Sequence, residues 1–184
     1  MSGFCDTKRE ILRFLDQNGI PYEAHEHERA FTIGDCLKMP FSDENVTICK
    51  NILLCNRQQT AFYLMLLKPL TPFRTAVVSK ALGVSRLSFA PEDALMELLH
   101  LSSGSVSPLG LYYDQEHRIT LCYERAVRDT PRIAFHPCDN SATVVFTQSV
   151  FWERVIPLLG VCPTALDLPQ TQGEASVSPY RCAH

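Results

Sequence analysis

The chain has 184 residues, of which 46% are hydrophobic and 20% are charged, and its formal net charge is −3. This composition is typical of one globular domain that is large enough to bury a core. The weakly acidic balance excludes binding to nucleic acid through a generally basic surface, so any such contact needs a local patch of cations. The chain has no secretion signal and no apolar stretch near the ~20 residues of a membrane helix. We therefore expect a cytoplasmic protein without membrane or DNA contact.

The eight cysteines are scattered along the chain and form no paired CxxC motif. Structural zinc sites commonly use such pairs, and a chain of this size has a core that makes a disulfide framework unnecessary. Most of the cysteines are therefore predicted to be small, buried, apolar residues. No metal site and no cofactor are expected.

The N-terminal part of the chain predicts a helix, a strand and a short irregular segment. Thr7 and Glu10 have the spacing of a capping box, apolar residues follow at helical intervals, and Gly19 marks the end of the helix. A short strand is expected over 21–27. A brief helix or loop is expected over 31–39.

The remaining elements mix strands and helices without a regular βαβ alternation. They are expected, in chain order, as a hairpin of strands 46–55 and 61–67, helices over 72–82 and 91–101, a loop over 104–108, a second hairpin of 109–113 and 119–123, a strand over 142–147 and a helix over 149–159. The fold class is therefore α+β, with a mixed, partly antiparallel sheet or partial barrel surrounded by helices. We expect one domain over 1–168 and a flexible tail over 169–184.

Lys50 is the most informative single residue, because it interrupts the apolar run 46–55. An uncompensated ammonium in an apolar layer is costly, so it normally shifts its pKa, finds a partner or lines a pocket. The pocket interpretation suits an enzyme or a ligand site. The alternative is that Lys50 lies near a strand end and its stem carries the charge outward to water.

Three segments together carry a family resemblance: Cys49-Lys50-Asn51, the loop Gly104-x-x-x-Pro108, and the run 135–143, which reads Phe-His-Pro-Cys-Asp-Asn-Ser-Ala-Thr. Jointly they resemble the prolyl-tRNA synthetase editing-domain superfamily, and most of all its free-standing alanine-editing branch. The resemblance extends from the first predicted helix to the last. It implies a hydrolase, an aminoacyl-tRNA deacylase, that removes alanine mischarged onto proline tRNA.

The resemblance also implies catalytic roles for Lys50, Gly104 and His136. The Lys50 ammonium would hold the terminal phosphate or ribose, or stabilise charge on the ester oxygen, and a deprotonated Lys50 acting as a general base is the alternative. Gly104 permits close backbone approach to the ester. His136 would form a pocket wall that selects a small side chain, with plain packing as the alternative. A hydroxyl of the terminal ribose would help to activate water.

Substrate-binding roles are implied for Asn51, Pro108, Phe31 and Thr32. Asn51 would orient the nucleotide end, although a structural amide is an equally good interpretation. Phe31 and Thr32 would form the pocket rim, whereas their local pattern alone indicates a loop anchor and a helix cap. Cys138 is not favoured as a nucleophile, because Pro137 restricts its geometry and no third group is evident to orient it.

The implied partner is the acceptor end of a mischarged tRNA, and prolyl-tRNA synthetase is a candidate protein partner. Arg128 and Arg132 are predicted tRNA contacts, with a solvated charged face as the alternative. Two other functions stay open at this point. One is an inactive RNA- or amino-acid-binding or regulatory module of the same fold, and the other is editing of serine or cysteine.

Overall fold

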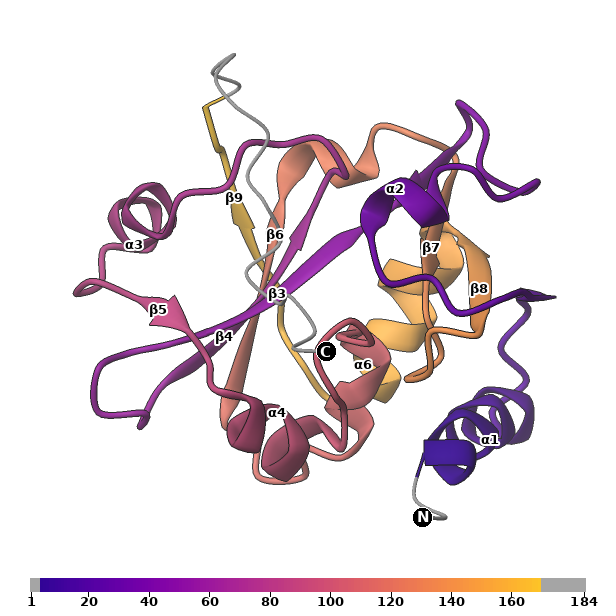
Figure 1. Ribbon diagram of the computed structural model, residues 1–184, viewed down its shortest axis with the longest axis horizontal. Coiled ribbons are helices and arrows are strands. Elements are labelled where there is room, and N and C mark those ends of the chain that lie inside the picture. The colour runs from indigo at the N-terminus through magenta and orange to yellow at the C-terminus, as the bar shows by residue number, and fades with distance from the viewer. Residues whose placement is uncertain (1–3, 170–184) are drawn as a thin grey trace.

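The computed structural model describes residues 4–169, and within this range strands and helices alternate in a mixed order (Figure 1). The elements are α1 (Phe4–Gln17), β1 (Glu23–Glu26), α2 (Ile33–Cys36), β2 (Val46–Ile48), β3 (Lys50–Cys55), β4 (Phe62–Leu67), α3 (Thr75–Leu82), β5 (Ser88–Phe89), α4 (Glu92–Leu99), the 3₁₀ helices η1 (Pro108–Tyr112) and η2 (Arg125–Arg128), β6 (Ile119–Glu124), β7 (Arg132–Phe135), β8 (Ala142–Thr147), α5 (Gln148–Val150), the π turn η3 (Phe151–Val155), α6 (Ile156–Leu158) and β9 (Thr164–Leu166). The predicted tail over 169–184 lies, apart from Pro169, outside the described residues.

The strands form two sheets, with the orders β1-β8-β7-β2 and β5-β3-β4-β6-β9. Both sheets are mixed: β7 and β8 are antiparallel whereas β2 and β7 are parallel, and β3 and β4 are antiparallel whereas β4 and β6 are parallel. In Figure 1 the five-stranded sheet occupies the left and centre of the molecule, and β7 and β8 lie to the right. The predicted α+β class with mixed sheets is confirmed.

The two sheets share one core. Their inner faces contribute residues such as Leu53, Leu64, Ile133 and Val144, and α1, α4 and the C-terminal helical segment close this core. A second cluster packs α3 against the outer face of the five-stranded sheet, and a third packs α2 against the outer face of the four-stranded sheet. Each helix therefore covers the sheet face that its apolar residues require.

The run 46–55 is two strands rather than the single buried strand that we predicted. β2 ends at Ile48 and pairs with β7, whereas β3 begins at Lys50 and pairs with β4 and β5. Cys49 alone separates them, and it is the point at which the chain leaves one sheet for the other. Lys50 is therefore the first residue of a strand, at the junction of the two sheets.

The first predicted hairpin is confirmed, with Cys55 opposite Phe62 and Lys50 opposite Leu67. The second is wrong, because 109–113 falls largely in the 3₁₀ helix η1 and β6 pairs in parallel with β4. The connection from β4 to β6 contains α3, β5, α4 and η1, and parallel pairing requires such a long crossover. Ser107 starts η1 by accepting a hydrogen bond from the Leu109 amide at 3.2 Å.

The predicted helices match the structure, except for the start of the first. α1 begins at Phe4, so Thr7 lies inside the helix and the predicted capping box is wrong. Gly19 has a φ of +59°, in the left-handed region expected after a helix end. α3 and α4 lie within the predicted ranges, and the last helix spans 148–158 with a π turn in its middle. No described helix is long and apolar enough to cross a membrane.

Candidate active site

A small cavity of about 110 Å³ opens where the chain passes from β2 to β3. Its walls come from the 30–36 segment, the β2–β3 junction, the 104–106 loop, the end of β7 and β8. The lining residues are Ala30, Phe31, Thr32, Ile33, Cys36, Ile48, Cys49, Lys50, Asn51, Gly104, Val106, Ala134, Phe135, His136 and Thr143. Lys50 is the one Lys, Arg, Asp or Glu among these described lining residues.

The cavity gathers most of the site residues predicted from the sequence. The residues that line it are Lys50, Gly104, His136, Asn51, Phe31 and Thr32. Pro108, Arg128 and Arg132 are not in the lining. Segments separated by more than a hundred residues in the chain thus meet at the junction of the two sheets.

Lys50 is half-buried, and its Nζ donates a hydrogen bond to the Thr71 carbonyl oxygen at 2.6 Å. An ammonium has three N–H donors, and Thr71 is the only hydrogen-bond acceptor that the described residues provide to it. Burial lowers the pKa of Lys50 from its ordinary value, and the nearby Glu124 carboxylate opposes that shift. The cavity therefore contains a desolvated cationic donor with N–H groups to spare.

Asn51 follows Lys50, and its side chain projects from the opposite face of β3. Its Nδ2 donates to the Val106 carbonyl oxygen at 2.9 Å, which ties the strand to the 104–106 loop. Its Oδ1 is buried and has no hydrogen-bond partner among the described residues. A buried acceptor without a donor is unfavourable by about 1–3 kcal/mol, and because the Oδ1 has almost no accessible surface, a ligand N–H or O–H group can reach it only if the cavity opens.

Gly104 has a φ of +89°, in the region that L side chains rarely adopt. A Cβ placed on it would meet nothing within 4 Å, so the space beside this backbone is open. The glycine therefore serves the backbone conformation of the cavity-lining loop rather than close packing. Pro108 begins η1 nearby, is buried, and stiffens the end of the same loop.

His136 is held in one tautomer by its neighbours. Its Nδ1 lies 2.8 Å from the Ala142 carbonyl oxygen, and because a carbonyl only accepts, Nδ1 carries the proton. Nε2 is then the acceptor, and it lies 3.7 Å from the Cys36 Sγ. Burial lowers the pKa of His136, so the ring is neutral at physiological pH.

A second histidine, His27, lies beside His136 outside the cavity lining. His27 lies with its Nδ1 2.7 Å from the Glu28 carbonyl oxygen, which fixes its proton on that nitrogen. Its Nε2 lies 2.9 Å from the Thr143 hydroxyl oxygen, and the His27 and His136 ring centroids are 5.9 Å apart. Thr143 therefore connects the cavity wall to a ring at the protein surface.

The rim segment begins with a helix cap. Thr32 caps α2 by accepting from the Asp35 amide at 3.1 Å, while the Asp35 carboxylate accepts from the Thr32 amide at 2.9 Å. This reciprocal box confirms the capping interpretation of Thr32. Phe31 precedes it and is 56% exposed, so an aromatic face stands at the cavity edge.

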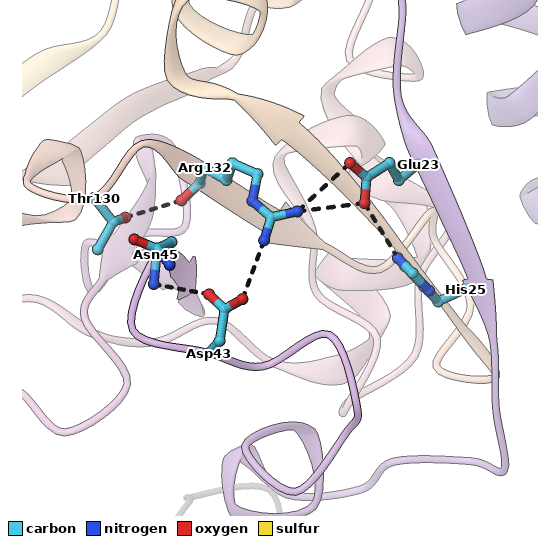
Figure 2. A network of polar contacts seen from close by, with 6 residues as sticks. All are labelled: Glu23, His25, Asp43, Asn45, Thr130 and Arg132. Atoms are coloured by element: carbon cyan, nitrogen blue, oxygen red, sulfur yellow. Dashed lines mark hydrogen bonds and ion pairs between the residues drawn. The ribbon is translucent and has the colours of Figure 1, made fainter.

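The two predicted tRNA contacts lie outside the cavity and differ in their surroundings. Figure 2 shows the Arg132 guanidinium between two carboxylates, at 3.4 Å from Glu23 and 3.2 Å from Asp43. Arg128 instead lies over the Trp152 ring, 5.0 Å from its centroid. Arg132 is thus largely neutralised within the protein, whereas the Arg128 charge has an aromatic neighbour.

Sequence reasoning gave no role in the site to several cavity residues, among them Cys36 and Thr143, or to one buried carboxylate, Glu124. Cys36 follows Thr32 by four residues, which is one helical turn, and Thr143 alternates with inward residues of β8; both signals were available but weak. Glu124 ends a buried strand as Lys50 begins one, and it is 2% exposed.

Cys138 is 1% exposed and its thiol pKa is raised by burial, which agrees with its rejection as a nucleophile. The described residues contain no group of three or more metal-ligating side chains.

Comparison with solved structures defines the fold class. A chain described as a candidate trans-editing enzyme for prolyl-tRNA synthetase superposes with a TM-score of 0.67 at 15% identity, over 89% of this chain and 98% of that chain. A second solved structure, described as hypothetical protein APE2540, gives a TM-score of 0.65 at 13% identity, over 86% and 98% of the two chains. The fold is therefore one that editing-type domains adopt.

Sequence comparison then gives the family. The prolyl-tRNA editing protein ProX of Acetoanaerobium sticklandii is 30% identical over 164 residues, covering 89% of this chain and 98% of that protein. The prolyl-tRNA synthetase associated domain-containing protein 1 of Danio rerio is 30% identical over 145 residues, or 77% of each chain. The model of the aminoacyl-tRNA editing domain matches residues 27–151. The chain belongs to the aminoacyl-tRNA editing domain family, which confirms the resemblance carried by the three sequence motifs.

Proposed function

We propose that this protein is a trans-acting aminoacyl-tRNA deacylase that hydrolyses the ester of alanine mischarged onto proline tRNA. Its family and its 30% identity to a prolyl-tRNA editing protein support this function. The observation that carries the proposal is a small cavity that contains a cation with unused N–H donors and is lined by Asn51, whose buried amide oxygen has no donor among the described residues. An aminoacyl ester presents the complementary groups.

In this proposal, Lys50 acts on the ester oxygen. Hydrolysis passes through a tetrahedral intermediate whose carbonyl oxygen becomes negative, and a preorganised cation in a poorly solvated site stabilises that charge. Because burial lowers the pKa of Lys50 while Glu124 raises it, the ammonium is desolvated and still has a counter-charge nearby. Lys50 is thus the group whose interaction strengthens most as the ester oxygen becomes an oxyanion.

Asn51 acts on the other end of the amino acid. When the cavity opens, its orphan Oδ1 accepts a hydrogen bond from the α-ammonium, while its Nδ2 stays on the Val106 carbonyl. The Gly104 backbone allows the 104–106 loop to approach the ester closely. The lining contains no Asp or Glu among the described residues, so a hydroxyl of the terminal ribose is our candidate for activating water.

Selection against proline follows from the size of the cavity. The neutral wall of Cys36, Ile48, Ala134 and His136 encloses a cavity of about 110 Å³ that admits a methyl group more readily than a pyrrolidine ring. Proline also has a secondary amine, which offers one N–H fewer to Asn51. Serine and cysteine fit the same space, so discrimination among these small side chains is weaker than discrimination against proline.

The deciding experiment measures ester hydrolysis of alanyl-, seryl-, cysteinyl- and prolyl-tRNA built on the same proline tRNA. The wild type should remove alanine fastest and leave proline, and Lys50→Ala should abolish the activity. Lys80→Ala, which changes an exposed lysine of α3, is the control. Binding of the charged tRNAs without faster ester loss would show that the protein is a binding module rather than an enzyme. Faster hydrolysis of seryl- or cysteinyl-tRNA than of alanyl-tRNA would show that serine or cysteine is the substrate.

The proposal includes the cytoplasm as location and the acceptor end of tRNA as partner. Arg128 and Arg132 remain predicted contacts for tRNA phosphates, and prolyl-tRNA synthetase remains a candidate protein partner. Co-purification of the synthetase with the tagged full-length chain, with and without ribonuclease, would separate a direct protein contact from one bridged by tRNA.

A further inference from the structure

A buried carboxylate, Glu124, acts on the Lys50 ammonium from outside the cavity lining. Glu124 ends β6, is 2% exposed and does not line the cavity. It accepts a hydrogen bond from the Lys68 amide at 2.9 Å, and the Thr71 hydroxyl donates to its two oxygens at 2.9 and 2.8 Å. A carboxylate taken out of water is unfavourable by several kcal/mol unless it is well paired, so this arrangement needs a reason.

The reason lies in the residue that Glu124 holds. Thr71 is 2% exposed, and while its hydroxyl donates to Glu124, its carbonyl oxygen accepts from Lys50 Nζ at 2.6 Å. The neighbouring Leu70 is 80% exposed, so Thr71 is buried beside a residue that faces solvent. One residue therefore connects the buried carboxylate to the cavity ammonium.

The sheet register brings these groups together. Lys50 pairs with Leu67 of β4, and Leu66 pairs with Tyr123, the residue before Glu124. The start of β3, the end of β4 and the end of β6 thus meet at one edge, and the 68–71 loop leaves β4 there. Lys68 of this loop turns its own ammonium toward Asp129, at 4.0 Å, so it does not replace Lys50 at the cavity.

We infer that Glu124 is a positioning residue for Lys50: it fixes Thr71, whose carbonyl oxygen holds the ammonium at the cavity, and it supplies the counter-charge. The catalytic consequence of this inference rests on the proposed function, whereas the placement of Lys50 does not. Among the described groups, Glu124 is the carboxylate whose charge opposes the effect of burial on Lys50. Glu124 does not touch the substrate, so it should affect turnover more than substrate binding.

The test compares Glu124→Gln with the wild type in two measurements. Trace acetylation with acetic anhydride over a range of pH, read by mass spectrometry of the Lys50 peptide, reports the protonation of Lys50 without any tRNA. In Glu124→Gln, Lys50 should become reactive at a lower pH, because the counter-charge is gone. On alanyl-tRNA, kcat should fall about tenfold near neutral pH with KM within about twofold.

Two further variants keep the test decisive. Glu97→Gln removes an exposed carboxylate that pairs with Arg118 at 2.7 Å, and it should change neither measurement. Thr71→Val retains the carbonyl and the buried charge but removes the hydroxyl, and it should lower kcat in the same direction even if Glu124→Gln fails to fold.

Unchanged labelling and unchanged kcat in folded Glu124→Gln, or in Thr71→Val if Glu124→Gln does not fold, would overturn the inference. If the wild type does not hydrolyse any of the charged tRNAs, the proposed function fails. The acetylation profile would still show whether Glu124 controls Lys50.

Discussion

The two walls of the cavity use polar groups in opposite ways. On the side of the five-stranded sheet, the Lys50 ammonium donates to the Thr71 carbonyl oxygen, and the Thr71 hydroxyl donates to the Glu124 carboxylate. These three residues form a hydrogen-bonded chain with a charged group at each end. On the side of the four-stranded sheet, burial keeps the His136 ring neutral, and the Ala142 carbonyl oxygen fixes its proton on Nδ1. The difference separates two tasks: the charged wall responds to charge that develops in a reaction, and the neutral wall shapes the space without adding a competing charge.

The largest expected effect comes from breaking the charged wall alone. Lys50→Met keeps the length of the stem but removes the ammonium, and it should lower kcat/KM on alanyl-tRNA by about 10²-fold, as loss of one preorganised donor does. Cys36→Ser on the neutral wall should stay within about threefold, because a hydroxyl can donate the same hydrogen bond to His136. Equal losses in both variants would remove the distinction between the walls.

Gly104 tests how strongly the backbone beside the charged wall is constrained. Gly104→Ala should lower the free energy of unfolding by about 1–2 kcal/mol, because its φ of +89° is unfavourable for a residue with a Cβ. Gly34→Ala in α2 is the matched control, since its Cβ would meet the Thr32 Oγ1 at an ordinary 3.6 Å. Urea unfolding measures both, and an equally destabilised control would show that neither effect is specific to the cavity loop.

The neutral wall predicts a dependence of stability on pH. The folded pKa of His136 is lowered below 6.5 by burial, so below that pH the unfolded chain takes up a proton that the folded chain resists. The contribution of His136 to stability is therefore complete above pH 6.5 and is lost as the pH falls through the lowered pKa. Thermal unfolding from pH 8 to pH 5 should show a smaller decline in His136→Asn. Parallel curves for the two proteins would contradict a buried, neutral His136.

The smallest expected effects concern the arginines outside the cavity. Arg128→Gln should reduce the slope of log affinity for tRNA against log salt by about one, the value for one lost phosphate contact. Arg132→Gln should reduce it less, because Glu23 and Asp43 already neutralise this guanidinium. An equal change in both slopes would mean that tRNA displaces the carboxylates from Arg132.

Lys50 and its neighbours show what the sequence could predict about this site. A single charge in an apolar run indicated Lys50, whereas Gly104 and His136 were indicated by their places in the family motifs, and all three line the cavity. These signals lie in short sequence segments, so they can be recognised without knowledge of the fold. The helix cap at Thr32 was recognisable for the same reason, and the structure shows it to be a capping box.

Glu124 and the break at Cys49 show what the sequence could not predict. Hydrophobic periodicity indicates that a segment is extended but not which strand it pairs with, so nothing signalled that 46–48 and 50–55 join different sheets. The parallel partner of β6 is more than fifty residues away in the chain. Without knowledge of that pairing, the sequence could not predict that Glu124 lies near Lys50, or that Thr71 connects the two residues.

The crossing of the chain at Cys49 links the shape of the cavity to the packing of the whole protein. Ile48 and Lys50 line the same cavity from different sheets, with one residue between them. A change in the angle between the sheets would therefore be expected to alter the dihedral angles of that residue and the distance across the cavity. A core substitution far from every lining residue, such as one at Leu64 or Val144, can therefore change substrate selectivity while leaving the lining itself unchanged.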